Sequence, residues 1–161
     1  MTDIQMVVFD LDFTLWDCDG TWCDHTSPPY RRCHPNHADE VQDSAGRTIS
    51  LYPDVRRIID DCHQKGLTLA LASRTYQPTW AKQLLQLFEI DRLFDVQQIF
   101  PDSKRTHFAN IEQQTGICYA NMLFFDDEMR NVRDVNSLGV RSVLVENGIN
   151  WQLYQQHIAK S

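Results

Sequence analysis

The sequence has 161 residues, with 15 basic side chains against 22 acidic ones, and therefore a net charge of −7. Hydrophobic content of 42% argues against a disordered chain. The acidic balance argues against nucleic acid or a membrane surface as the main partner, and no apolar run has the length of a membrane helix. Five cysteines and no signal-peptide pattern suit a reducing compartment. We therefore expect one domain, residues 1–161, that is cytoplasmic and monomeric.

Five short apolar runs are typical of buried strands. They cover residues 6–9, 67–72, 94–100, 122–125 and 140–145. The first, second and fourth end abruptly in polar side chains, as strands of a parallel sheet do where they leave the core.

Helical patterns separate most of these runs. Pro53 suits the first position of a helix that ends at Gly66, and Ser103 can cap a helix that ends at Gly116. Apolar residues at helical spacing also mark 80–88, 129–138 and 151–158. Alternation of strands and helices predicts an α/β fold, a doubly wound, Rossmann-like and mostly parallel sheet with helices on both faces.

Residues 16–50 break the alternation. This segment is rich in Asp, His, Cys, Pro and Gly, and it stands where a crossover helix is expected. Long connections in compact domains are usually lids or binding loops. We therefore expect a flap over the active site, with a hairpin across 41–49 that turns at Ser44-Ala45-Gly46.

The chemically active side chains follow the predicted strands at their carboxyl ends, where ligands bind in open α/β sheets. They are Asp10, Asp12 and Thr14 after the first strand, Ser73 and Arg74 after the second, Lys104 after the third, and Asp126 and Asp127 after the fourth. Clustered carboxylates need a cation, and hard oxygen ligands favour Mg²⁺. A metal, a lysine and a hydroxyl around a nucleophilic carboxylate predict a phosphoryl-transfer site.

The pattern Val8-Phe9-Asp10-Leu11-Asp12-Phe13-Thr14-Leu15, followed in order by Ala72-Ser73-Arg74, Lys104 and Phe125-Asp126-Asp127, resembles the four motifs of the haloacid dehalogenase superfamily. More narrowly, the chain resembles the small magnesium-dependent phosphatases that have no large cap domain. The resemblance implies a five-stranded sheet of order 3-2-1-4-5, a flap after the first strand and no large cap. It also implies a Mg²⁺-dependent phosphomonoester hydrolase with an aspartyl-phosphate intermediate.

The same resemblance assigns roles in the first motif. Asp10 corresponds to the nucleophile and a metal ligand. Asp12 corresponds to the general acid and base, and its backbone carbonyl to a metal ligand. Thr14 is expected to order this loop through its hydroxyl.

Roles in the later motifs follow in the same way. Ser73 and Lys104 correspond to phosphate-binding residues, although Ser73 could also cap a helix. Arg74 matches the narrower group, where it grips the phosphate or the substrate; the alternative is a surface charge or a salt bridge to the flap. In the last motif we favour Asp127 as the direct metal ligand. Asp126 and Asn131 would support it, Asn131 by orienting a water on the metal.

The flap raises a second metal question because it contains six soft or borderline ligands. They are Cys18, Cys23, His25, Cys33, His34 and His37. A structural zinc would take four of them, but the spacing matches no common zinc signature, which leaves free thiols and surface histidines as the alternative. His25 could instead reach the substrate, because the segment from Asp24 to Tyr30 resembles a flap segment of the narrower group.

Two other functions remain open at this point. The chain could be a receiver-like signalling module with a phosphorylated aspartate, or a catalytically silent zinc-bearing interaction protein on the same fold. For the enzyme, the related phosphatases suggest phosphotyrosine, sugar phosphates or phosphorylated glycated amines, either as small molecules or as side chains of a phosphorylated protein.

Overall fold

A five-stranded parallel sheet forms the centre of the computed structural model, which describes residues 3–159. Its strands are β1 (Met6–Phe9), β6 (Thr68–Ser73), β7 (Val96–Ile99), β8 (Met122–Asp126) and β9 (Arg141–Leu144). They lie in the order β7-β6-β1-β8-β9, and all neighbours run parallel. This is the order 3-2-1-4-5 along the chain, so the predicted fold class is confirmed. Strand β1 lies in the middle, between β6 and β8.

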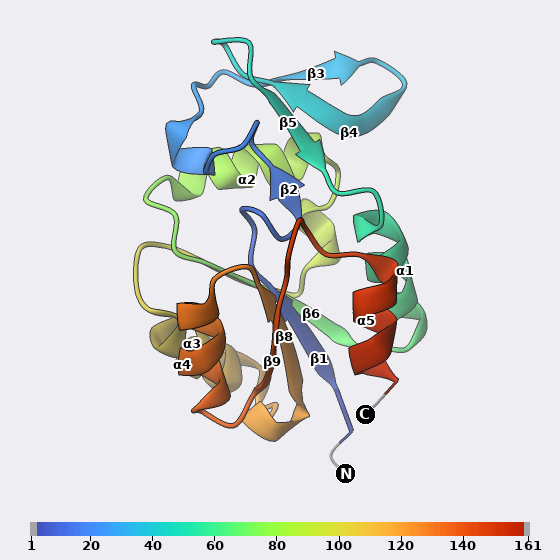
Figure 1. Ribbon diagram of the computed structural model, residues 1–161, viewed down its shortest axis with the longest axis vertical. Coiled ribbons are helices and arrows are strands. Elements are labelled where there is room, and N and C mark those ends of the chain that lie inside the picture. The colour runs from blue at the N-terminus through green and yellow to red at the C-terminus, as the bar shows by residue number, and fades with distance from the viewer. Residues whose placement is uncertain (1–2, 160–161) are drawn as a thin grey trace.

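Helices cover both faces of this sheet (Figure 1). They are α1 (Val55–Gln64), α2 (Pro78–Leu87), α3 (Lys104–Thr115), α4 (Met129–Asn136) and α5 (Trp151–Ile158). Side chains of a strand alternate between the two faces. In β1, Val7 and Phe9 pack with α1, α2 and α5, whereas Met6 and Val8 pack with α3 and α4. Burial on both sides explains why the strand is apolar at every position.

The helix ends agree with the sequence in part. Ser103 caps α3, because its side chain accepts the backbone N–H three residues later, and Gly116 ends the helix with φ of 72°. Pro53, however, does not begin a helix. The N–H of Val55 bonds the carbonyl of Tyr52 at 3.2 Å, so Pro53 lies in a turn that precedes α1. The fixed φ of proline suits this turn equally well, so a proline does not by itself mark the first residue of a helix.

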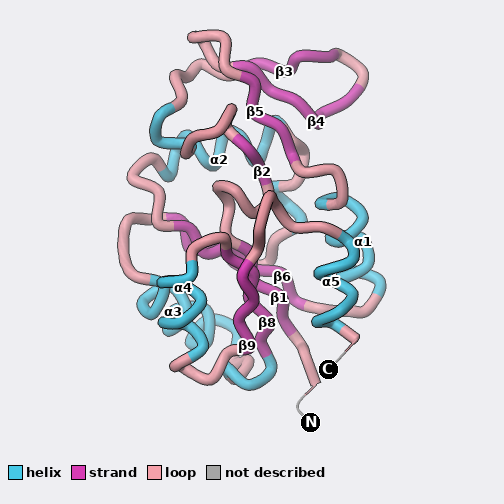
Figure 2. The backbone as a smooth tube through the Cα atoms, in the orientation of Figure 1, coloured by secondary structure: helices cyan, strands magenta, loops and turns pink. Residues whose placement is uncertain are grey.

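The segment after β1 folds as a second sheet, which we call the insert. Its elements are β2 (Trp16–Asp17), the 3-10 helix η1 (Cys23–His25), β3 (Arg31–His34), β4 (His37–Gln42) and β5 (Thr48–Leu51). The strands are antiparallel in the order β2-β5-β4-β3. Figure 2 shows this sheet beyond the carboxyl ends of the parallel strands, with α2 beneath it.

The insert is more ordered than the expected flap. The predicted hairpin is present, since Val41 pairs with Ile49 across β4 and β5. The full four-stranded sheet was not predicted, because β2 has two residues and every residue of β3 is exposed. Neither strand carries an apolar pattern.

The remaining short elements are η2 (Asp91–Leu93) and η3 (Tyr119–Asn121). Within residues 3–159, no helix combines the length and the apolar character that crossing a membrane requires.

Candidate active site

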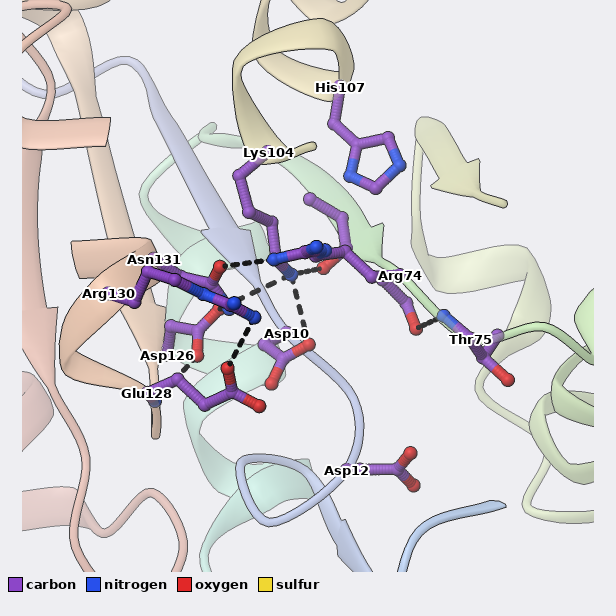
Figure 3. Close-up of polar contacts among 12 residues, drawn as sticks. Asp10, Asp12, Arg74, Thr75, Lys104, His107, Asp126, Glu128, Arg130 and Asn131 are labelled. Atoms are coloured by element: carbon purple, nitrogen blue, oxygen red, sulfur yellow. Dashed lines mark hydrogen bonds and ion pairs between the residues drawn. The ribbon is translucent and has the colours of Figure 1, made fainter. Parts of the chain in front are cut away.

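The ammonium of Lys104 lies at the centre of a buried polar cluster (Figure 3). Its Nζ donates to Oδ1 of Asp10 at 3.0 Å and lies 3.3 Å from Oδ2 of Asp126. It also donates to the carbonyl of Ala72 in β6. Lys104 is 1% exposed, and its position at the start of α3 aims the side chain at the carboxyl ends of β1, β6 and β8. Three oxygen atoms therefore surround the three protons of one buried cation.

The two adjacent aspartates at the end of β8 differ in their partners. Oδ1 of Asp126 accepts the N–H of Glu128 at 2.8 Å, and Oδ2 accepts Nδ2 of Asn131 at 3.1 Å as well as facing Lys104. Asp126 is fully buried. The carboxylate of Asp127 lines the pocket, interacts with the side chain of Asp10 and accepts its own backbone N–H. Asp127 is therefore more available to a metal ion than Asp126, whose two oxygen atoms are held by Glu128, Asn131 and Lys104.

The charges of this cluster do not balance. Asp10, Asp126 and Asp127 offer oxygen atoms that all lie within 4.8 Å of one another. Burial raises the pKa of Asp10 to about 8, even though Lys104 opposes the shift. Burial and repulsion between carboxylates also raise the pKa of Asp126 and of Asp127. One lysine cannot neutralise three carboxylates, and a hard divalent cation such as Mg²⁺ fits this set of oxygen donors.

Asp12 lies apart from this cluster and faces the insert. Its Oδ1 accepts Nε1 of Trp16 at 2.7 Å and the backbone N–H of Cys23 at 3.0 Å. Burial raises its pKa to about 6. Figure 3 shows its side chain separated from the residues around Lys104. The carboxylate of Asp12 is therefore not one of the clustered metal donors, which leaves its backbone carbonyl as the predicted contribution to the metal.

Two hydroxyl predictions need correction. The hydroxyl of Thr14 is buried without a hydrogen-bond partner among residues 3–159, so it does not order the loop as expected. Backbone bonds hold the loop instead, among them the N–H of Ile149 to the carbonyl of Thr14 at 2.9 Å. Ser73 is not a helix cap, because α2 begins only at Pro78. Its buried side chain lines the pocket that also contains Asp10.

Arg74 lies inside the site rather than on an unrelated surface. Its Nη1 donates to Oδ1 of Asn131 at 3.3 Å, and Asn131 in turn donates to Asp126. Asn131 therefore connects Arg74 to the carboxylate cluster. Both residues line the same pocket as Lys104.

The pocket has a volume of about 400 Å³ and contains every predicted site residue except Thr14 and Asp126. Its wall also includes residues that the sequence analysis did not select: Trp22, Thr75, Tyr76, Pro101, Asp102, Ser103, Glu128 and Arg130, together with Asp24. Trp22 and Tyr76 are 49% and 76% exposed, and Met129, at 43%, stands between two lining residues. Among the described residues these three are the large hydrophobic side chains left exposed, and Trp22 and Tyr76 line the same pocket. Trp22 and Tyr76 gave no periodic signal because they lie in loops, whereas Met129 belongs to the helical pattern across 129–138.

His107 also escaped the sequence analysis. It is fully buried one turn after Lys104, and its Nε2 lies 3.0 Å from the carbonyl of Phe100, which precedes the pocket wall. Burial lowers its pKa to about 4, so it stays neutral. A neutral imidazole donates from Nε2 and thereby holds this wall in place.

The alternative of a structural zinc in the insert is not supported. Within residues 3–159, the insert contains no group of three His, Cys, Asp or Glu ligands close enough to hold a metal. Cys18 and Cys23 are buried beside Asp12, whereas Cys33 lies on the exposed edge strand. His25 does not line the pocket; its Nδ1 bonds the hydroxyl of Thr21 at 2.7 Å.

Comparison with known proteins gives three related results. A model of the Acid Phosphatase family matches residues 4–161. The chain is 42% identical over 153 residues to magnesium-dependent phosphatase 1 of Homo sapiens, covering 94% of this chain and 84% of that protein. It is 38% identical over 146 residues to a HAD-like hydrolase superfamily protein of Schizosaccharomyces pombe, covering 84% of this chain and 82% of that one.

Solved structures agree on the fold. The crystal structure of a HAD-superfamily hydrolase from Ehrlichia chaffeensis superposes with a TM-score of 0.70 at 12% sequence identity, covering 99% of this chain and 98% of that chain. A sequence identity of 12% supports a shared fold and nothing further.

Proposed function

Because the chain belongs to the Acid Phosphatase family, within the haloacid dehalogenase superfamily, and is a phosphatase, we propose that it hydrolyses phosphomonoesters through an aspartyl-phosphate formed on Asp10. The observation that carries this proposal is the setting of Asp10 in the pocket. Lys104 holds its Oδ1 at 3.0 Å, and no nitrogen or hydroxyl donor among residues 3–159 reaches its Oδ2. One oxygen is therefore oriented by a cation while the other remains available for attack on phosphorus.

We propose Mg²⁺ as the cation of this site, in line with the name of the human relative. Asp10, Asp127 and the backbone carbonyl of Asp12 would hold it, with Asp126 and Asn131 in support. When bound, Mg²⁺ neutralises charge on the carboxylates and on the transferring phosphoryl group.

In the first half of the reaction, an oxygen of Asp10 bonds to phosphorus while the bond from phosphorus to the ester oxygen breaks. Asp12 gives its proton to that departing oxygen. The hydrogen bonds from Trp16 and Cys23 hold Oδ1 of Asp12 and leave Oδ2 free to carry the proton. A pKa of about 6 keeps part of the Asp12 population protonated near neutral pH, which general acid catalysis requires.

In the second half, the carboxylate of Asp12 takes a proton from water as the water oxygen bonds to phosphorus. The bond from phosphorus to Asp10 breaks, and inorganic phosphate and free Asp10 carboxylate result. Lys104, Ser73 and Arg74 line the same pocket and supply donors for the phosphoryl oxygens throughout.

The organic part of the substrate is proposed only as a class. Within residues 3–159 no large cap domain covers the mouth of the pocket, which exposes Trp22 and Tyr76. Such a mouth accepts a phosphotyrosine-type side chain, a sugar phosphate or a related small phosphate ester, and aromatic side chains favour leaving groups with a flat face.

The test is hydrolysis of para-nitrophenyl phosphate by the wild type with Mg²⁺, by the wild type with EDTA, and by Asp10→Asn with Mg²⁺. Asp134→Asn serves as the matched control, because Asp134 lies far along α4 in an ion pair with Arg105. Turnover that needs both Mg²⁺ and Asp10 supports the proposal. Stable phosphorylation of Asp10 without turnover would favour a receiver-like switch instead, and turnover by Asp10→Asn at the wild-type rate would remove Asp10 as the nucleophile.

A further inference from the structure

A carboxylate of the insert holds the loop that follows β6. Asp24 in η1 accepts a hydrogen bond from the hydroxyl of Thr75 on Oδ1 and one from the backbone N–H of Tyr76 on Oδ2, the latter at 3.1 Å. These residues are 51 and 52 positions away in sequence. Thr75 is buried and Asp24 is half-buried. We call this pair of bonds the Asp24 latch.

The latch acts on the segment that carries Arg74. Arg74 lies directly before Thr75 and lines the phosphate pocket. Its guanidinium bonds Asn131 at 3.3 Å, and Asn131 bonds Asp126 at 3.1 Å. A continuous chain of hydrogen bonds and one peptide link therefore runs from the insert to the carboxylate cluster.

Asp24 is itself part of the pocket wall, which makes its charge unfavourable for an anionic ligand. Both of its oxygens, however, already accept hydrogen bonds from the loop. The carboxylate therefore holds the pocket wall, and its oxygen atoms are not free to bind the substrate. Repulsion by its charge would weaken phosphate binding, whereas its hold on the wall would strengthen it. Because these two effects have opposite signs, an experiment can separate them.

We infer that Asp24 is a positioning residue for the proposed phosphatase reaction: by holding Thr75 and Tyr76, it fixes Arg74 at the phosphate pocket, so that the insert strengthens phosphate binding without contacting the phosphate. The inference rests on the proposed function for its substrate. It gives the insert a role that the four phosphatase motifs do not include.

The experiment compares full-length Asp24→Asn, Thr75→Val, the double variant and Thr75→Ser with the wild type. Asp24→Asn keeps the shape but has one neutral carbonyl oxygen in place of two charged acceptors, so it weakens the latch. Thr75→Val removes the hydroxyl from the other side of the latch, together with the acceptor for the N–H of Gln77. Asp19→Asn is the matched control. Asp19 is exposed, has no polar contact within residues 3–159, and has φ of 62°, which asparagine tolerates.

Two readouts are used on the Mg²⁺-loaded protein. The first is the dissociation constant of inorganic phosphate, measured by calorimetry without turnover. The second is the split between KM and kcat for para-nitrophenyl phosphate. Circular dichroism and the thermal midpoint show whether each variant folds. If Asp24→Asn does not fold, Thr75→Val tests the same latch.

We expect Asp24→Asn and Thr75→Val each to weaken phosphate binding and raise KM by about two- to tenfold, the factor that one or two net hydrogen bonds represent. The effect on kcat stays within about twofold, because no group that touches the reacting atoms changes. The effect of the double variant is smaller than the product of the two single effects, since Asp24 and Thr75 share one hydrogen bond of the latch. Thr75→Ser and Asp19→Asn bind phosphate like the wild type.

Tighter phosphate binding by Asp24→Asn would show that its charge acts directly on the ligand, and would overturn the inference. Multiplied effects in the double variant, or an effect of Asp19→Asn as large as that of Asp24→Asn, would overturn it too. A wild type that binds phosphate but hydrolyses nothing would refute the proposed function, while the binding comparison would still decide the role of Asp24.

Discussion

Lys104 and Asp10 are 94 positions apart in the chain, yet Nζ of one lies 3.0 Å from Oδ1 of the other, and both side chains are buried. The contact joins the end of the central strand to the first turn of α3. A buried charge that loses its partner is costly. The pair therefore links the stability of the carboxyl end of the central strand to the positive charge of Lys104, which the reaction needs.

Replacing Lys104 by methionine should lower kcat for para-nitrophenyl phosphate by about 10²- to 10³-fold, as removal of a key electrostatic donor does. The variant should also unfold at a lower temperature in EDTA, because Asp10 and Asp126 lose their shared cation. Lys82→Met is the control, since Lys82 forms an exposed pair with Asp91. A loss below about threefold would reduce Lys104 to a structural role.

Asp12→Asn should separate the two halves of the reaction. Asparagine keeps an acceptor for Trp16 and Cys23 but cannot donate or take up the catalytic proton. A good leaving group departs without an acid, so phosphorylation of Asp10 continues while its hydrolysis slows by about 10²- to 10⁴-fold. Rapid-mixing kinetics with mass spectrometry would show a burst and a protein heavier by one phosphoryl group. Steady turnover without accumulation would place the acid and base elsewhere.

Without metal, the protein should lose stability as the pH rises. The pKa of Asp10 is about 8 in the folded chain against an ordinary value of 3.8. The folded state thus keeps a proton that the unfolded chain releases, and this contribution to the free energy of unfolding falls between about pH 4 and pH 8. Asp126 and Asp127, whose pKa values are also raised, act in the same direction.

Mg²⁺ should reverse this loss, because it favours the ionised carboxylates. Thermal unfolding in EDTA and in Mg²⁺ would show a difference in Tm that grows from pH 5 to pH 8. In Asp10→Asn the difference should shrink at every pH. An equal difference across the pH range would mean that the metal does not compete with protons at this cluster.

Trp22→Ala should weaken the binding of aryl phosphates and leave inorganic phosphate unaffected. Trp22 is half-exposed at the mouth and packs edge-on against Phe13, with ring centroids 6.0 Å apart. Loss of one aromatic contact should raise KM for para-nitrophenyl phosphate by about two- to tenfold. Glycerol phosphate, which has no flat face, is the control substrate. An equal change in KM for both would show that Trp22 only shapes the wall.

Gly148→Ala should destabilise the fold more than Gly46→Ala. Both glycines have positive φ, of 81° and 91°, so both substitutions carry the same conformational strain. A Cβ at Gly148 would lie 2.3 Å from the ring of Tyr52, whereas one at Gly46 meets nothing within 4 Å. Urea unfolding should show an extra loss of about 1–3 kcal/mol for Gly148→Ala. Equal losses would mean that the Tyr52 ring moves away freely.

The family resemblance predicted the sheet order, and the position of the motifs at the ends of apolar strands predicted which side chains lie near the site. The residues alone could not show which of Asp126 and Asp127 is the direct metal ligand. Both follow the same buried strand, and only the donors of Glu128 and Asn131 show which carboxylate is already occupied.

The insert was harder to predict because its order does not come from apolar periodicity. Asp43, for example, accepts the N–H groups of Ser27, Ala45 and Arg47. Such polar bonds, which hold the local turn and join it to Ser27, leave no periodic signal in the sequence. The zinc hypothesis failed for a related reason: cysteines close in sequence, such as Cys23 and Cys33, divide between a buried and an exposed position.

The insert leaves and re-enters the parallel domain through a single pair of strands, in which Trp16 lies opposite Leu51. The N–H of Tyr52 bonds the carbonyl of Leu15 at 3.0 Å and closes this stem completely. Beyond the stem the insert is held to the parallel domain by side-chain contacts, among them those of Asp24 and Arg56. The exposed β3–β4 end can lengthen, shorten or change composition during evolution while the strands that carry the catalytic groups keep their spacing. This end of the insert is therefore a place where the fold can acquire new specificities, one loop at a time.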